Sequence, residues 1–268
     1  MKILAENSIF NQSLMRAANF LNVNGKILYD NKDIFNEFKR FEPDIFICYK
    51  ENINDGYLRL FKKNKIKVFI ISDQEINLDI ENFQLIHQCE NYIEKDIKSL
   101  FLPFGADTLL YKLGKVVDNL ICDIVYDNPK KQHKDYIYKL IRDYNVRLFG
   151  DADNEYKILP QYLGFLTNEL LYDVYSSSSF GLTFNSGNFI SQEYYKIFSC
   201  GGLCLSMKDD IIYDKLNEFV VFFENEEEMK DKINFIKKQP NVRKIMINKS
   251  LKFVEKNSYI ERIKQLLS

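Results

Sequence analysis

The chain has 268 residues, of which 46% are hydrophobic and 15% aromatic, and its 37 basic and 38 acidic residues give a formal net charge of −1. These apolar side chains suffice for packed cores, which excludes wholesale disorder. The near-neutral charge excludes a global field toward nucleic acid or an anionic membrane, although it leaves room for a local basic patch. At roughly 100–200 residues per domain, the length fits one large domain or two small ones.

The first hundred residues alternate between strand and helix patterns. Short apolar runs typical of strands occupy residues 2–5, 26–30, 43–49, 67–72, 83–89 and 99–105. Amphipathic runs typical of helices lie at residues 11–23, 33–41 and 55–64. Continuous apolar strands separated by helices predict a parallel sheet covered on both faces, which is a Rossmann-like half.

A connection at about residues 108–119 leads into a second half with the same alternation. Strands are predicted at residues 122–128, 146–150, 180–184, 203–207 and 219–223. Helices are predicted at residues 134–144, 167–178, 191–199, 225–238 and from about 243 to 267. We therefore predict an α/β protein of two tandem Rossmann-like domains, 1–110 and 111–268, with a cleft between them. The long last helix is expected to return toward the first domain.

Cysteine usage bears on the compartment. The five cysteines are odd in number and scattered, mostly inside apolar runs: Cys48, Cys89, Cys122, Cys200 and Cys204. Such usage indicates buried thiols in a reducing compartment. No further cluster of His or Cys residues accompanies Cys200 and Cys204, so no zinc site is predicted. The N-terminal apolar run is too short for a signal peptide, and no stretch reaches the roughly 18 apolar residues of a membrane span. We expect a cytoplasmic protein.

Several segments of the second half follow one another in an order typical of a known family. They read "LPFGAD" at 102–107, "VRLFG" at 146–150, "YLGFLTNELLYDVYSSSSFGLTFN" at 162–185, "YYKIFSCGGLCLS" at 194–206, "VVFFENEEEMKDKINFIKK" at 220–238 and "SYIERIKQLL" at 258–267. In this order they resemble the C-terminal domain of GT-B glycosyltransferases, specifically the CgeB-like, spore-maturation-type group. The first half is similar to that family only in its alternating pattern.

The resemblance implies a hexosyltransferase-type enzyme that moves a sugar from a nucleotide-sugar donor to an acceptor. The donor is a co-substrate, and no further cofactor or metal is implied, because helix N-termini and basic side chains can offset the charge of the leaving diphosphate. The donor would be held by the second domain and the acceptor by the first. The near-neutral charge leaves polysaccharide, protein, lipid-linked and nucleic-acid acceptors open.

Two loops of the second domain are candidates for the donor site. Lys130 and Lys131 lie between a strand and a helix, which suits a diphosphate, although a solvated basic turn would look the same. Asn185, Ser186 and Gly187 supply small side chains and backbone N–H groups before the next helix, although a plain loop would also read this way.

Glu193 and Lys196 stand one turn apart on the helix that follows. At the position of Lys196 the family has an acidic residue that binds the ribose hydroxyls, and at that of Glu193 a basic one, so the charges are exchanged here. Residues at i and i+3 share one helical face, so Glu193 could still reach the ribose while Lys196 approaches a phosphate. The alternatives are an ordinary surface ion pair, or an altered or lost donor site on a catalytically inactive nucleotide-binding or scaffold protein.

Catalytic candidates come from the ends of the first domain's strands. Asp73 follows the predicted strand at 67–72 and could act as general base in an inverting reaction, and Glu6 is a similar candidate after the first strand. Both could instead be turn or capping residues. His87 lies in an apolar run, which predicts a core histidine with satisfied hydrogen bonds.

Asp151 and Asp153 form an Asp-x-Asp string after the strand at 146–150. GT-A enzymes bind a divalent metal and a nucleotide sugar with such a string. A capping or turn role is the alternative that the short string favours, so no metal site is predicted.

Overall fold

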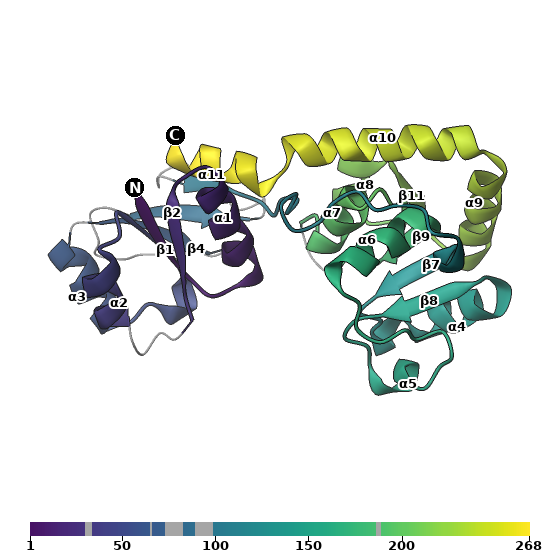
Figure 1. Cartoon of the computed structure of the whole chain (residues 1–268), viewed down its shortest axis with the longest axis horizontal. Helices are drawn as coiled ribbons and strands as arrows, with labels where there is room; N and C mark the ends of the chain where they lie inside the picture. The colour runs from purple at the N-terminus through teal and green to yellow at the C-terminus, as the bar shows by residue number, and fades with distance from the viewer. Residues whose placement is uncertain (30–33, 65, 73–82, 89–98, 186–188) are drawn as a thin grey trace. The chain divides into compact units, whose positions relative to one another are not determined.

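The computed structural model describes residues 1–29, 34–64, 66–72, 83–88, 99–185 and 189–268. These residues form two compact units, and the chain passes between them twice. Unit 1 comprises Met1–Gly105 and Ser258–Ser268, and unit 2 comprises Ala106–Asn257. Both are α/β units with a parallel sheet, as the sequence predicts (Figure 1).

Unit 1 contains a six-stranded parallel sheet in the order β2-β1-β3-β4-β5-β6. Its strands are β1 (Lys2–Glu6), β2 (Asn24–Leu28), β3 (Ile45–Tyr49), β4 (Lys67–Ile71), β5 (Phe83–His87) and β6 (Ser99–Phe101). Four α-helices belong to the described part of this unit: α1 (Ile9–Phe20), α2 (Ile34–Phe41), α3 (Asp55–Asn64) and α11 (Tyr259–Leu267). Successive side chains of β1 alternate between two cores, with Ile3 and Ala5 in the first and Leu4 in the second. Helices α1 and α11 cover the first core, and α2 and α3 cover the second.

Unit 2 contains a five-stranded parallel sheet in the order β11-β10-β9-β7-β8. Its strands are β7 (Cys122–Asp127), β8 (Val146–Phe149), β9 (Ser178–Thr183), β10 (Cys204–Met207) and β11 (Val220–Phe223). Its described α-helices are α4 (Lys134–Asp143), α5 (Asn154–Lys157), α6 (Asn168–Ser177), α7 (Gln192–Ser199), α8 (Asp210–Leu216), α9 (Glu226–Lys238) and α10 (Pro240–Lys256). One core lies between the sheet and α4 with α9. On α7, Tyr195 and Phe198 pack against Phe253 of α10.

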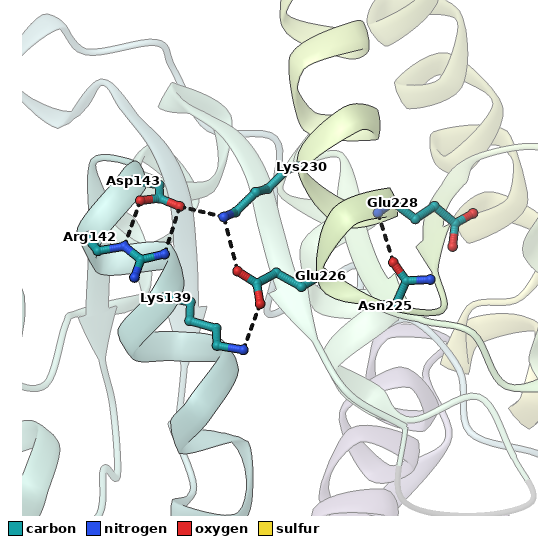
Figure 2. A network of polar contacts seen from close by, with 7 residues as sticks. All are labelled: Lys139, Arg142, Asp143, Asn225, Glu226, Glu228 and Lys230. Carbon is teal, nitrogen blue, oxygen red and sulfur yellow. Dashed lines mark hydrogen bonds and ion pairs between the residues drawn. The ribbon is translucent and has the colours of Figure 1, made fainter.

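A charged network joins α4 to α9 within unit 2 (Figure 2). Lys230 of α9 lies 2.8 Å from a carboxylate oxygen of Asp143 and 3.0 Å from one of Glu226. Lys139 of α4 lies 2.6 Å from Glu226, which closes the connection between the helices. Because these side chains are partly exposed, we expect the network to fix the pairing of the helices more than to add stability.

The C-terminal helix predicted from about residue 243 to 267 is wrong in one respect. It is two helices, α10 and α11, separated at Asn257 and Ser258. The hydroxyl of Ser258 accepts a hydrogen bond from the backbone N–H of Glu261 at 3.4 Å and so starts a new helix. Tyr259 and Ile263 of α11 then pack in the core of unit 1.

Four of the five cysteines lie in the described residues, and all four are buried free thiols, as predicted. Burial raises the pKa of the Cys200 thiol to about 12, so this group is a neutral core side chain at ordinary pH. Cys89 lies outside the described residues. None of the helices described above combines the length and the apolar character that crossing a membrane requires.

Candidate functional site

The candidate donor residues gather around the carboxyl ends of β7, β8 and β9. These strands are neighbours in the sheet of unit 2, and parallel strands end at the same edge. Ligands of open α/β sheets bind beyond this edge. The candidate ligand site is therefore formed by the turn after β7, the turn after β8 and the N-terminus of α7.

Lys196 of α7 reaches the last residue of β7. Its ammonium group donates a hydrogen bond to the carboxylate of Asp127, and both side chains are only 10% exposed. Burial by itself lowers the pKa of Lys196, but the attraction of Asp127 outweighs it and holds the pKa above its usual value. The interpretation of Glu193 and Lys196 as a surface ion pair needs correction, because the partner of Lys196 is the buried Asp127. Its predicted contact with a phosphate stays a prediction.

The N-terminus of α7 lacks a side-chain cap. Ser191 occupies the N-cap position, but its hydroxyl accepts no hydrogen bond from the first turn. Its Oγ is buried and has no hydrogen-bond partner among the residues that the structure describes. Glu193 lies half-buried in the first turn, and the described residues form no ion pair with it. Backbone N–H groups of a first helical turn are unsatisfied within the helix, so this terminus can accept an anion.

The loop before α7 is described only in part. Asn185 donates a hydrogen bond from Nδ2 to the carboxylate of Asp209, 3.2 Å away. This contact ties the end of β9 to the start of α8. Ser186 and Gly187, the other two predicted ligands of this loop, lie outside the described residues.

The basic turn after β7 packs against the turn after β8. Lys130 donates a hydrogen bond to the backbone carbonyl of Asp151 at 3.1 Å, and its Nζ lies 3.6 Å from the carboxylate of the same residue. The side chain of Lys131 is exposed and pairs with no carboxylate in the described part of the chain. The structure therefore leaves Lys131 the more accessible of the two predicted diphosphate ligands.

Asp151 and Asp153 have roles within these turns. The carboxylate of Asp153 accepts a hydrogen bond from the backbone N–H of Lys131 at 2.6 Å, while that of Asp151 faces Lys130. The turn role that the sequence favoured is therefore confirmed for Asp153. Over the ranges that the structure describes, no three His, Cys, Asp or Glu side chains are grouped as metal ligands would be.

An aromatic cluster stands beside the same turns. The ring of His133 stacks on Phe184 with centroids 3.8 Å apart, and the phenol oxygen of Tyr126 lies 2.7 Å from Nδ1 of His133. Burial raises the pKa of Tyr126, so its phenol keeps its proton at ordinary pH. A protonated phenol donates to Nδ1 when His133 is neutral and carries its own proton on Nε2, because the roles of the two atoms follow the tautomer of the ring. Burial lowers the pKa of His133, which agrees with this arrangement.

Sequence reasoning missed Asp127, Tyr126 and Phe184 as parts of the candidate site. Each ends or follows a strand that the sequence predicts correctly, and that position at the carboxyl edge is the signal that could have found them. Their partners, however, lie on other elements.

In unit 1, Glu6 ends β1 and is only 1% exposed. Its carboxylate accepts hydrogen bonds from the backbone N–H of Tyr49 at 2.8 Å, from Nδ2 of Asn52 at 2.9 Å and from the phenol of Tyr57 at 3.0 Å. Burial raises the pKa of Glu6, and the hydrogen bonds oppose this effect. The residue thus joins β1 to the segment after β3 and to α3. The other predicted base, Asp73, lies outside the described residues.

His87 is a core residue, as predicted. Its side chain is 2% exposed, at the end of β5. Neither ring nitrogen has a hydrogen-bond partner among the described residues. The burial of His87 is confirmed, and the expectation that its hydrogen bonds are satisfied stays a prediction, because residues 73–82 and 89–98 lie outside the described part of the chain.

A family profile described as "Glycosyl transferase-like" matches residues 132–268, just over half of the chain. The chain therefore belongs to the glycosyl transferase-like family. The matched region begins in the basic turn after β7 and includes the N-terminus of α7. No curated protein matches the chain.

Solved structures of GT-B glycosyltransferases share the fold over nearly their whole length. Anabaena HepE in complex with UDP and glucose superposes with a TM-score of 0.64 at 9% identity, covering 100% of this chain and 98% of that one. Sucrose-phosphate synthase from Thermosynechococcus elongatus superposes with a TM-score of 0.67 at 9% identity, covering 99% of this chain and 97% of that one. A glycosyltransferase from Rickettsia africae superposes with a TM-score of 0.68 at 11% identity, covering 99% of this chain and 96% of that one. At these identities the likeness shows the fold alone.

Proposed function

We propose that this protein transfers a hexose-type sugar from a nucleotide-sugar donor to an acceptor, and that it belongs to the CgeB-like group of its family. Membership of the glycosyl transferase-like family and the GT-B fold support the reaction class. The structures of Anabaena HepE with UDP and with UDP-glucose support a nucleotide-sugar donor. The buried free thiols support a reducing, cytoplasmic compartment.

The observation that carries the proposal is the uncapped N-terminus of α7 at the carboxyl edge of the unit 2 sheet. Within the described part of the chain the buried hydroxyl of Ser191 has no hydrogen-bond partner, which supports a ligand at this terminus. A diphosphate oxygen would accept from this hydroxyl and from the backbone N–H groups, and the helix dipole would favour its negative charge.

The remaining contacts with the donor are assigned to charged side chains that form no ion pair within the described part of the chain. The half-buried carboxylate of Glu193 accepts hydrogen bonds from the two ribose hydroxyl groups, and the exposed ammonium group of Lys131 approaches the diphosphate. Lys196 is not assigned a contact with the donor, because it pairs with Asp127. Since the helix terminus and Lys131 offset the charge of the leaving diphosphate, the transfer proceeds without a metal ion.

The acceptor is assigned to unit 1, where Asp73 or Glu6 would act as general base in an inverting reaction. Burial raises the pKa of Glu6, which is the direction that makes a carboxylate a better general base. Its three hydrogen bonds and its burial favour a structural role instead. Asp73 is therefore the preferred of the two candidates.

One observation favours a second function, a nucleotide-binding or scaffold protein without catalysis. At the position where the family has an acidic ribose ligand, this chain has Lys196, which is satisfied internally by Asp127. A donor site rebuilt in this way could bind a nucleotide without turning it over.

Two measurements separate these functions. Thermal-shift screening with uridine, guanosine, adenosine and cytidine diphosphates should show one nucleotide that raises the melting temperature, because a ligand of the native state stabilises it by mass action. Sugar release is then measured with the matching nucleotide sugars and an acceptor panel, in the presence of a chelator. Turnover that survives chelation supports the metal-independent transferase. Binding without turnover supports the second function, and the absence of any binding refutes both.

A further inference from the structure

A pocket in unit 1 lies at the edge of the sheet opposite Glu6. It is lined by Pro43, just before β3, and by Ile66, just before β4, so it opens at the amino ends of these strands. Residues from the last turns of α2 and α3 form its walls. Its volume of about 700 Å³ falls within the range typical of small-molecule sites. Glu6, the catalytic candidate among the described residues, ends β1 at the carboxyl edge, so it does not account for this pocket.

The pocket has an apolar floor. Phe38 of α2 and Leu60 of α3 line it and are 5% and 7% exposed. Phe35 stands at its rim with 54% of its surface exposed. A Cβ atom on Gly56 would lie 3.4 Å from the ring of Phe35, so this ring rests on the first turn of α3 and bridges the two helices. An organic group entering the pocket would therefore meet aromatic and aliphatic surface.

The rim of the pocket is cationic. Lys39, Arg59 and Lys63 all line it with exposed side chains. Over the described part of the chain, none of the three forms a hydrogen bond or an ion pair. Elsewhere on the surface many lysines do pair with carboxylates, as Lys249 does with Glu218 at 2.8 Å. The rim therefore carries three positive charges that form no ion pair with another described residue.

Nearby negative charge does not balance these cations. The carboxylate of Glu42 also lines the pocket, and Nζ of Lys2, which does not line it, lies 4.0 Å from that carboxylate. The ends of α2 and α3 each contribute about half a negative charge. The three cations exceed the carboxylate and the two helix ends by about one charge. Lys39 and Lys63 offset these helix ends, but Arg59 stands a turn earlier on α3 and has no such role.

We propose that this pocket binds an organic phosphate. The apolar group of the ligand packs on Phe38 and Leu60, and its phosphate lies among Lys39, Arg59 and Lys63. A guanidinium group matches two phosphate oxygens at once, and the lysines add point charges around them. The same chemistry occurs in a soluble phosphate monoester and in the headgroup of an anionic phospholipid.

Calorimetric titration of the full-length chain with phenyl phosphate tests the soluble source. Arg59→Gln/Lys63→Gln removes two rim cations, and Lys238→Gln/Lys252→Gln removes two exposed lysines of unit 2 as the matched control. Each lost charge-assisted contact weakens binding by about tenfold or more, so the rim variant should bind at least tenfold more weakly and the control should match wild type. Inorganic phosphate should bind more weakly than phenyl phosphate, because it cannot use the apolar floor.

Co-sedimentation with vesicles of phosphatidylglycerol and phosphatidylcholine tests the lipid source with the same variants. Loss of phosphatidylglycerol binding in the rim variant alone assigns the pocket to a lipid headgroup, and loss of phenyl phosphate binding in the rim variant alone assigns it to a soluble ligand. Equal loss in both double variants, or no binding of either probe, overturns the proposal. Equal affinity for inorganic phosphate and phenyl phosphate also overturns it, since the apolar floor would then have no part in binding.

Discussion

Lys196 and Asp127 are 69 positions apart in the sequence and form a buried ion pair in unit 2. The pair joins α7 to the end of β7 at the edge of the sheet where the donor site is proposed. Taking two charges out of water is costly, so such a pair stabilises the fold mainly by avoiding an uncompensated charge. This relationship has a direct consequence for mutation.

Lys196→Met should destabilise unit 2 strongly. The substitution leaves Asp127 buried without its partner, which typically costs about 3–5 kcal/mol. The double variant Lys196→Met/Asp127→Leu removes both charges and should recover much of that loss. Urea unfolding of the three proteins measures the difference. Lys249→Met, which breaks the exposed pair with Glu218, is the control and should change the free energy of unfolding little. A single variant as stable as wild type would contradict the importance of the pair.

Gly150→Ala should disturb the same pair from the neighbouring turn. Gly150 has a φ of +82°, and a Cβ atom there would lie 2.2 Å from Oδ1 of Asp127. Gly164 has a φ of +79° but no atom within 4 Å of such a Cβ, so Gly164→Ala isolates the backbone strain. We expect about 1–3 kcal/mol of destabilisation from strain in both variants and a further loss in Gly150→Ala. Thermal unfolding compares the two variants. Equal losses of stability would show that a Cβ atom at position 150 does not disturb Asp127.

Much of the fold could be predicted because the local pattern determines it. The alternation of apolar runs and amphipathic helices indicates parallel sheets, and α4, α6, α7 and α9 begin and end close to the predicted positions. The break between α10 and α11 was missed because a single N-cap, Ser258, interrupts an otherwise helical pattern.

The site was less predictable because its contacts are non-local. Helical spacing pairs Glu193 with Lys196, whereas the fold pairs Lys196 with Asp127 on a distant strand. The helical period relates only residues close in the sequence, so it cannot predict this contact. The exchanged charges did not indicate whether Lys196 would pair with Glu193 or with Asp127. Burial had the same effect at Glu6, where three donors from distant segments meet one carboxylate.

Glu193→Gln should weaken nucleotide binding without unfolding the protein. If its carboxylate accepts the ribose hydroxyls, loss of the charge costs ~1.5–3 kcal/mol, or roughly ten- to a hundredfold in affinity. Calorimetric titration of the best nucleotide into wild type and variant measures this. Glu255→Gln on the exposed side of α10 is the matched control and should bind like wild type. If Glu193→Gln also binds like wild type, Glu193 is not a ribose ligand.

His133 should make the stability of unit 2 depend on pH near neutrality. Burial lowers its pKa below the ordinary value of 6.5, so the unfolded chain binds more protons than the native one between the two values. Its contribution to stability is therefore fully present above about pH 6.5 and is lost as the pH falls from there through the lower native value. Protonation of Nδ1 also removes the acceptor for the phenol proton of Tyr126, so this contact then persists only with the phenol as acceptor.

Tyr126→Phe tests this account of His133. The variant keeps the aromatic packing but removes the donor that favours the neutral ring, so the pKa of His133 should rise toward its ordinary value. The chain has only two histidines, so NMR titration gives two imidazole responses, and His133→Gln identifies which belongs to His133. Urea unfolding between about pH 5 and 8 should then show a smaller loss of stability toward low pH in Tyr126→Phe than in wild type. A wild-type pKa at or above 6.5 would show that the neutral, hydrogen-bonded ring is not the native form.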